Sequence, residues 1–69
     1  MSDNRADEYK KKILNILKNA FPDDLTTIEI ARQLNVHRNT VVRYLGELVG
    51  EGKLKSRRIG KYVLYRILK

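Results

Sequence analysis

The sequence predicts an α+β fold in which three short helices precede a β-hairpin. Apolar residues recur at helical spacing as far as residue 50, and the pattern then changes to the alternation of a strand. A glycine at position 60 divides the alternating segment and can supply its turn. Since 69 residues have room for one core, we expect a single domain over residues 1–69, with a disordered tail at residues 1–4.

The first helix is expected over residues 5–19. Pro22 follows it and stops propagation, because proline lacks the backbone N–H that a helix uses. Phe21 is expected to close the core beside this helix. The apolar stripe that packs the helix against the core consists of Tyr9, Ile13, Ile16, Leu17 and Ala20.

A capping box opens the second helix, which is expected over residues 27–34. The Thr26 hydroxyl can accept from the backbone N–H of Glu29, and the Glu29 carboxylate can accept from the N–H of Thr26. Asn35 ends the helix, because asparagine is the best substitute for glycine where the backbone turns left-handed. The residues that this helix buries are Ile30, Ala31 and Leu34.

The third helix is expected over residues 38–50, and its two faces differ sharply. Its core face recurs at i, i+4 and i+7 and consists of Val41, Leu45 and Leu48. The opposite face is polar and cationic. Tyr44 and Tyr62 are both expected to pack at the rim of the core, where a tyrosine hydroxyl can still find a hydrogen-bond partner.

Two strands are expected over residues 53–57 and 61–68, around a turn formed by Arg58, Ile59 and Gly60. Because successive side chains of a strand point to opposite faces, the second strand has one face suited to burial. That face consists of Val63, Tyr65 and Ile67.

The formal net charge of +7 lies entirely in the second half of the chain. Residues 1–36 carry six basic and six acidic side chains, whereas residues 37–69 carry nine basic and two acidic ones. A cationic surface concentrated in one half of a small domain is typical of proteins that bind nucleic acid. Charge alone also fits a solvated basic surface with no such partner.

Two helices joined by a short turn, the second one cationic, form a helix-turn-helix arrangement. Residues 25–67 resemble a winged helix-turn-helix domain of the bacterial and archaeal transcription-regulator type. The resemblance rests on the segments LTTIEIARQLNVHRNTVVRYLGELVGEGKL and RRIGKYVLYRI. It implies a three-helix bundle followed by a β-hairpin wing, with double-stranded DNA as the partner. The one departure is His37, where such proteins usually have serine or threonine.

The exposed face of the third helix carries the side chains that would read DNA in the major groove. Arg38 and Arg43 can each bond guanine O6 and N7, and Asn39 can bond adenine N6 and N7. Val42 can touch a thymine methyl group, and Gly46 leaves room for a close approach. The residues expected to contact phosphates near the helix starts are Thr26, His37 as the helix cap, and Thr40.

The hairpin adds cations that would reach the flanking DNA backbone or minor groove. These are Lys55, Arg57, Arg58 and Lys61. Arginine favours a narrow minor groove, because the electrostatic potential there is more negative. The alternative interpretation is an edge hairpin that charge protects against aggregation.

Other functions have less support from the sequence. The chain has no cysteine, one histidine and no glycine-rich phosphate loop, so we expect no enzyme, no metal or cofactor and no small-molecule effector. We expect no membrane segment and a cytoplasmic protein associated with the nucleoid. Two alternatives remain open: a winged-helix module that binds an acidic protein partner, and a sequence-tolerant nucleoid-binding protein.

One domain of this size would contact only a short DNA site, and specific binding therefore favours a homodimer that contacts two such sites. No dimerisation helix is expected after the last strand. The candidate dimer surfaces are therefore the first helix with its N-terminal extension, or the apolar residues Leu64 and Leu68.

Overall fold

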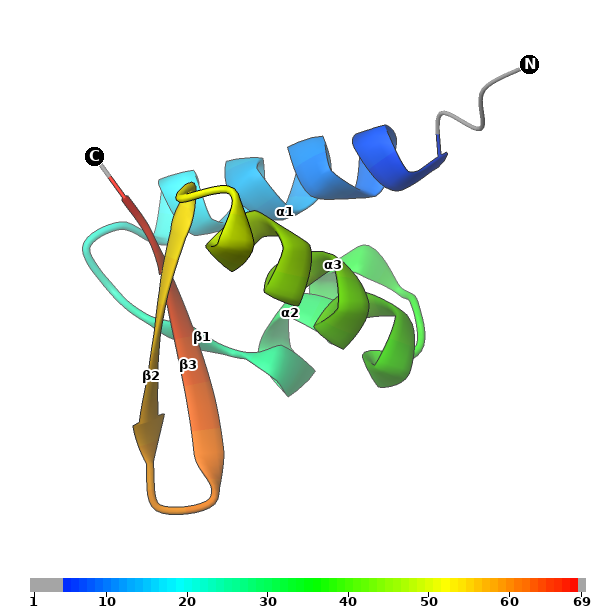
Figure 1. Ribbon diagram of the computed structural model, residues 1–69. Coiled ribbons are helices and arrows are strands. Elements are labelled where there is room, and N and C mark those ends of the chain that lie inside the picture. The colour runs from blue at the N-terminus through cyan, green and yellow to red at the C-terminus, as the bar shows by residue number, and fades with distance from the viewer. Residues whose placement is uncertain (1–4, 69) are drawn as a thin grey trace.

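The computed structural model describes residues 5–68. Its elements follow in the order α1 (Arg5–Ala20), β1 (Leu25–Thr26), α2 (Thr27–Leu34), α3 (Arg38–Gly50), β2 (Leu54–Ile59) and β3 (Tyr62–Ile67). Figure 1 shows α1 crossing one side of the molecule, while the β2–β3 hairpin extends past α2 and α3 and ends far from α1. This arrangement confirms the predicted fold class. The predicted tail at residues 1–4 lies outside the described residues.

The core forms where the three helices meet the base of the hairpin. The predicted core face of α3 is confirmed, since all three of its residues are fully buried. In α1, Ile13 and Leu17 are buried, and Leu14, which the predicted stripe leaves out, also packs against the core. The buried residues are Ile13, Leu17, Ile30, Ala31, Val41, Leu45, Leu48, Leu54 and Tyr65.

Both predicted boundaries of α2 are confirmed. The Thr26 hydroxyl accepts from the Glu29 N–H at 3.2 Å, and Glu29 Oε1 accepts from the Thr26 N–H at 2.8 Å. Asn35 has φ = 58°, the left-handed conformation expected of it, and its N–H donates to carbonyls of the last helical turn. These two signals fix the length of α2 and therefore the angle at which the chain enters α3.

The sheet has three antiparallel strands in the order β1–β3–β2, where the sequence predicts two. The additional strand, β1, is only two residues long and pairs Leu25 with Tyr65. Two residues carry no periodicity, so no pattern in the sequence marks them as a strand.

The predicted hairpin turn was wrong by two residues. Arg58 and Ile59 belong to β2, and the turn consists of Gly60 and Lys61, with Ile59 opposite Tyr62. Gly60 has φ = 59°, which fits the primed two-residue turns that match the twist of a hairpin. The hairpin is therefore longer at its tip than the sequence indicates.

The expectation that Phe21 closes the core was also wrong. Phe21 follows the last residue of α1 and is 39% exposed. The core at this end of the molecule is filled by Leu17, which is fully buried, and by Leu25, which packs against it from β1.

One carboxylate ties the hairpin to the loop before β1. Asp24 Oδ1 accepts from Nε of Arg66 at 2.8 Å, and its Oδ2 lies 2.9 Å from Nε of Arg57. The Asp24 side chain is only 8% exposed, although both arginines face solvent more freely. The hydrogen bond from Arg66, supported by the charges of both arginines, holds the pKa of Asp24 below its ordinary value.

We expect Asn35→Ala to lower the free energy of unfolding by about 1 kcal/mol, because a Cβ-bearing side chain without a local polar group is strained in the left-handed region. Asn35→Gly is the matched control and should leave stability nearly unchanged, since glycine adopts this conformation freely. Urea unfolding of the three proteins measures the difference. Equal loss in both variants would show that the Asn35 side chain, rather than its backbone conformation, supports the turn.

We expect Asp24→Asn to destabilise the protein at neutral pH and to reduce its sensitivity to acid. A carboxyl group whose pKa is lowered by folding adds stability above its unfolded pKa, and this stability is lost as the pH falls through the folded pKa. The stability difference between wild type and Asp24→Asn should therefore shrink as the pH falls from about 5 to about 2. Urea unfolding at each pH tests this, and a constant difference would contradict it.

Candidate nucleic-acid interface

The burial of one side of α3 fixes which side chains its other sides present. With Val41 and Leu45 in the core, the helical period places Asn39 and Arg43 on the outer side, where both are exposed. Gly46 lies on the same side, and a Cβ added there would meet no atom within 4 Å. Asn39, Arg43 and Gly46 are all exposed, so this outer side of α3 faces solvent.

The acidic side chains near α3 are bound by lysines at its C-terminal end. The Nζ of Lys10, from α1, lies 2.8 Å from a carboxylate oxygen of Glu47 and 3.0 Å from one of Glu51. The Nζ of Lys53 lies 3.5 Å from the other oxygen of Glu51. The hydrogen bonds that Lys10 donates to Glu47 and Glu51 raise the pKa of Lys10, and the bond to Glu51 lowers the pKa of that carboxyl group. The first turn of α3 has no acidic residue. The positive electrostatic potential at the N-terminus of α3 is therefore not offset by an acidic side chain of the first turn.

His37 is the N-cap of α3, as the sequence predicts. Its backbone is extended, and its ring Nδ1 accepts from the N–H of Asn39 at 3.1 Å. An imidazole can take the place of the usual hydroxyl because a neutral ring has one accepting nitrogen. The remaining nitrogen, Nε2, carries the hydrogen in this tautomer and can donate to a further acceptor.

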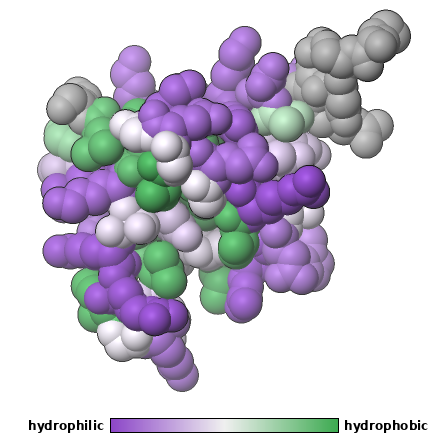
Figure 2. Space-filling model, in the orientation of Figure 1, coloured by the Kyte–Doolittle hydropathy of each residue, from purple (hydrophilic) through white to green (hydrophobic). Residues whose placement is uncertain are grey.

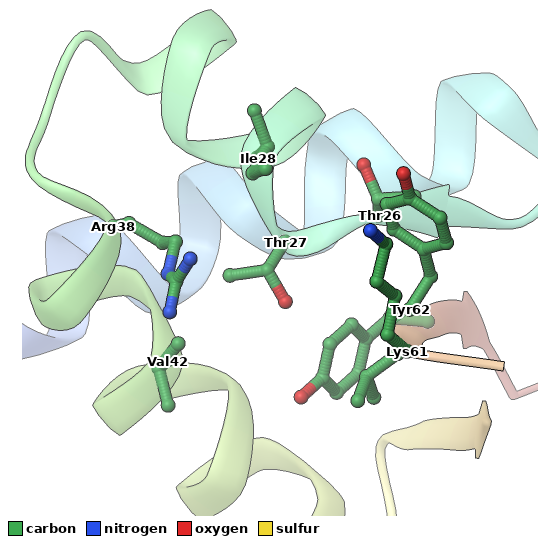
Figure 3. A pocket seen from close by; sticks show the side chains of 9 residues that line it. Thr26, Thr27, Ile28, Arg38, Val42, Lys61 and Tyr62 are labelled. Carbon is green, nitrogen blue, oxygen red and sulfur yellow. The ribbon is translucent and has the colours of Figure 1, made fainter. Parts of the chain in front are cut away.

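A groove of about 210 Å³ lies between the start of α2, the start of α3 and the hairpin. Figure 3 shows Arg38 and Val42 on the α3 side of this groove, and Lys61 and Tyr62 on the hairpin side, with Thr27 between them. The groove thus has a cation on each of two sides. Its lining residues are Thr26, Thr27, Ile28, Arg38, Val42, Lys61, Tyr62, Val63 and Tyr65.

Sequence reasoning missed three residues of this groove. Thr26 and Thr27 both line the groove. The Thr26 hydroxyl donates its one hydrogen to Glu29 Oε1 at 3.0 Å, so Thr27 is the better donor to a bound group. Ile28 is 44% exposed, and its position off the buried face of α2 was the signal that could have found it. Tyr62 is 52% exposed, so its predicted place at the rim of the core was wrong.

Tyr44 does pack as expected and closes the other flank of α3. Its ring stacks on Tyr9 of α1, with ring centroids 5.5 Å apart. Thr40 lies near this flank by helical period and is half-buried. The side of α3 that faces α1 is therefore covered, which leaves the outer side and the groove side open.

The four predicted hairpin cations lie on different faces of the sheet. Arg58 is opposite Val63 and shares the face that looks toward the helices, whereas Arg57 is opposite Leu64 on the other face. Lys55 shares the face of Arg57, and Lys61 is in the turn. The structure therefore brings Arg58 and Lys61 to the side of α3, and it turns Lys55 and Arg57 away.

Within residues 5–68, no group of three or more histidine, cysteine or acidic side chains could hold a metal ion. No helix in the same range is long and apolar enough to cross a membrane.

Comparison with known proteins identifies the family. The winged helix-turn-helix domain matches residues 3–61, which include all three helices, β2 and the hairpin turn. We found no significant match to a curated protein. Such a domain is typically a non-enzymatic fold, and its family suggests DNA binding. The extent of the match and the order of the elements agree, and the chain belongs to the winged helix-turn-helix domain family.

Proposed function

We propose that this protein is a transcriptional regulator that binds double-stranded DNA at the nucleoid, with α3 in the major groove. The observation that carries the proposal is the outer side of α3, which faces solvent and presents Asn39 and Arg43. An α-helix fits the major groove, where these two residue types can each form two hydrogen bonds to one base. The acidic residues that would repel phosphates are bound by Lys10 at the far end of the helix.

The remaining residues around α3 divide into base contacts and backbone contacts. Arg38 and Val42 face the groove side of α3 and would read bases next to those read by the outer side. His37 would donate from Nε2 to a phosphate while it caps the helix. Thr40 stays a predicted phosphate contact. Thr26 has no free donor for a phosphate, because its hydroxyl and its N–H both donate to Glu29. Thr27, whose hydroxyl points into the groove in Figure 3, would take its place.

The wing would contact DNA beside the major-groove site, chiefly through Arg58 and Lys61. These two residues lie toward α3, and both are exposed. We assign Lys55 and Arg57 a weaker part, because they lie on the opposite face and Arg57 is paired with Asp24.

We expect duplex DNA to bind with an affinity that falls steeply with salt, by about 0.9 in the log–log slope for each phosphate neutralised. Arg43→Ala should reduce the preference among duplex sequences by about 1–3 kcal/mol. Arg58→Ala should weaken binding to all sequences and lower the salt slope by about 1. Fluorescence anisotropy with labelled duplexes across a salt series measures both effects.

Lys18→Ala is the charge-matched control, because it also removes one exposed cation, but from α1. It should change the affinity and the slope less than either arginine substitution. Equal effects of all three would mean that only net charge matters, which is the sequence-tolerant nucleoid-binding alternative. Failure of every duplex to bind at low salt would contradict the proposal.

A second candidate function is a module that binds an acidic protein partner on the same surface. It is favoured by the exposure of Ile28 and Val42, at 44% and 43%, because protein interfaces use apolar anchors in this way. The salt series separates the two candidates, since this module would bind no duplex.

We also propose that the protein acts as a homodimer, because two half-sites would supply the specificity that one α3 lacks. Leu68 is the better of the two predicted apolar contacts, since it is exposed, whereas Leu64 is half-buried beside Arg57 and Arg66. We expect sedimentation equilibrium to show a concentration-dependent dimer that Leu68→Ser weakens. A monomer at the highest concentration measured would contradict this part of the proposal.

A further inference from the structure

Strand β2 leaves one edge of the sheet without a partner strand. In the order β1–β3–β2 it is the last strand, and no other strand of the described chain lies beyond it. Only its first residue, Leu54, is buried, and the five residues that follow are exposed. Figure 1 shows the end of the hairpin projecting past the helices. The edge is therefore open along most of β2.

A hydrogen bond at the base of the hairpin shows which backbone groups of β2 face this open edge. The N–H of Leu68 donates to the carbonyl of Lys53 at 3.1 Å, just before β2 begins. Because bonded and non-bonded pairs alternate in an antiparallel ladder, every second residue from Lys53 onward directs its backbone groups toward β3. The N–H and C=O groups of Ser56 and Arg58 therefore point away from β3, into the open edge.

Positive charge is what protects this edge from pairing with a like strand. Proteins close open edges with prolines, bulges, covering segments or charge. Within residues 54–59, β2 has no proline, and its register with β3 is continuous. Its exposed cations are Lys55, Arg57 and Arg58. A second copy of β2 on this edge would bring like charges together, which is unfavourable, whereas an acidic strand would be attracted.

The face of the sheet turned away from α3 adds an apolar contact beside the edge. Lys55, Arg57 and Ile59 share that face, and Ile59 is 53% exposed. In Figure 2, apolar atoms lie among strongly polar ones toward the end of the hairpin. Asp24 is only 8% exposed and is already bound by Arg57 and Arg66. Lys55 lies opposite Arg66 and has no acidic partner within residues 5–68.

We propose that the open edge of β2 binds an extended acidic segment of another protein, which joins the sheet as a fourth strand antiparallel to β2. Its main chain would pair with that of Ser56 and Arg58, as in other cases where a peptide adds to a sheet edge. Its alternate side chains would place carboxylates beside Lys55 and Arg57. The next side chain on that face would be apolar and would cover Ile59.

A second DNA duplex matches this edge less well than a strand does. Phosphate oxygens only accept hydrogen bonds, so a duplex would leave the edge carbonyls of Ser56 and Arg58 unpaired. It would also offer no apolar side chain to Ile59. A strand supplies donors, acceptors and side chains at the spacing that β2 requires.

The proposed strand and the proposed DNA site use different parts of the hairpin. Pairing at the edge engages the backbone of Arg58, whereas its side chain stays on the face that looks toward α3. Lys55 and Arg57, which the structure turns away from α3, would bind the carboxylates. The inference does not rest on DNA binding, and one chain could hold both partners at once.

The probe is a short peptide with blocked ends and the order valine, threonine, glutamate, threonine, glutamate. Laid antiparallel on β2, it places valine opposite Ile59 and its glutamates opposite Arg57 and Lys55. Its threonines lie opposite Arg58 and Ser56 and pair with their backbone groups. N-methylation of the first threonine removes a donor that faces β2, whereas N-methylation of the first glutamate removes one that faces solvent. Both modified peptides keep the charge of the original.

We expect the peptide to shift the amide NMR signals of β2 and to slow hydrogen exchange at the N–H groups of Ser56 and Arg58. Binding should weaken as salt screens the charges. N-methylation of the first threonine should weaken binding by about tenfold, because a backbone hydrogen bond is lost. N-methylation of the first glutamate should leave the affinity nearly unchanged.

Variants of the protein test the same edge from the other side. Ser56→Pro removes the N–H that faces the edge, and proline is tolerated in an edge strand at such a position. It should weaken peptide binding by about tenfold, whereas Ser56→Thr, the matched control, should bind as wild type does. Lys55→Glu should lose the peptide and regain a version with lysine in place of its last glutamate. The amide spectrum of each variant shows whether the hairpin is intact.

Three results would overturn the inference. The first is absence of peptide binding to wild type up to about 1 mM. The second is equal affinity for the two methylated peptides, which would make the contact purely electrostatic and is measured on wild type alone. The third is slowed exchange at Ser56 caused by excess duplex DNA and not by the peptide, which would assign the edge to a second duplex. The peptide measurements need no DNA, so failure of the proposed function is detected separately.

Discussion

The burial of one side of α3 is the constraint on which the rest of the structure depends. Val41, Leu45 and Leu48 are fully buried against α1, α2 and the base of the hairpin. Because the helix has 3.6 residues per turn, this contact also fixes the direction of every other side chain on it. Asn39 and Arg43 face outward as a consequence of core packing. The proposed recognition surface is thus the side of α3 opposite the core.

Ion pairs partly neutralise the acidic side chains that lie near this surface. Lys10 holds two glutamates where α1 meets the end of α3, and Asp24 is held by two arginines behind the hairpin. The pairs of Lys10 with the two exposed glutamates contribute little to stability. Their larger consequence is the distribution of charge, because Lys10 and the two arginines partly neutralise acidic side chains, while Arg38, Arg43, Arg58 and Lys61 are exposed cations on the open sides of α3 and the hairpin. Such a distribution attracts a polyanion to one side of the molecule.

The hairpin combines an anchored base with a free tip. Its base is fixed by buried Leu54 and Tyr65, by pairing with β1, and by the Asp24 contacts. Beyond these contacts the strands pair with each other as far as Ile59 and Tyr62, and the residues of β2 after Leu54 are exposed. A hairpin with a fixed base and an exposed tip suits contact with an extended partner such as a DNA duplex.

The sequence by itself determined the features that depend on near neighbours. The capping box at Thr26, the left-handed Asn35 and the core face of α3 are local patterns, and each was predicted with its position. Only the tertiary structure decided strand β1, the two-residue turn and the split of hairpin cations between faces, since these follow from pairing with β3. The ion pair of Asp24 with Arg66 joins residues 42 positions apart, so no local pattern encodes it.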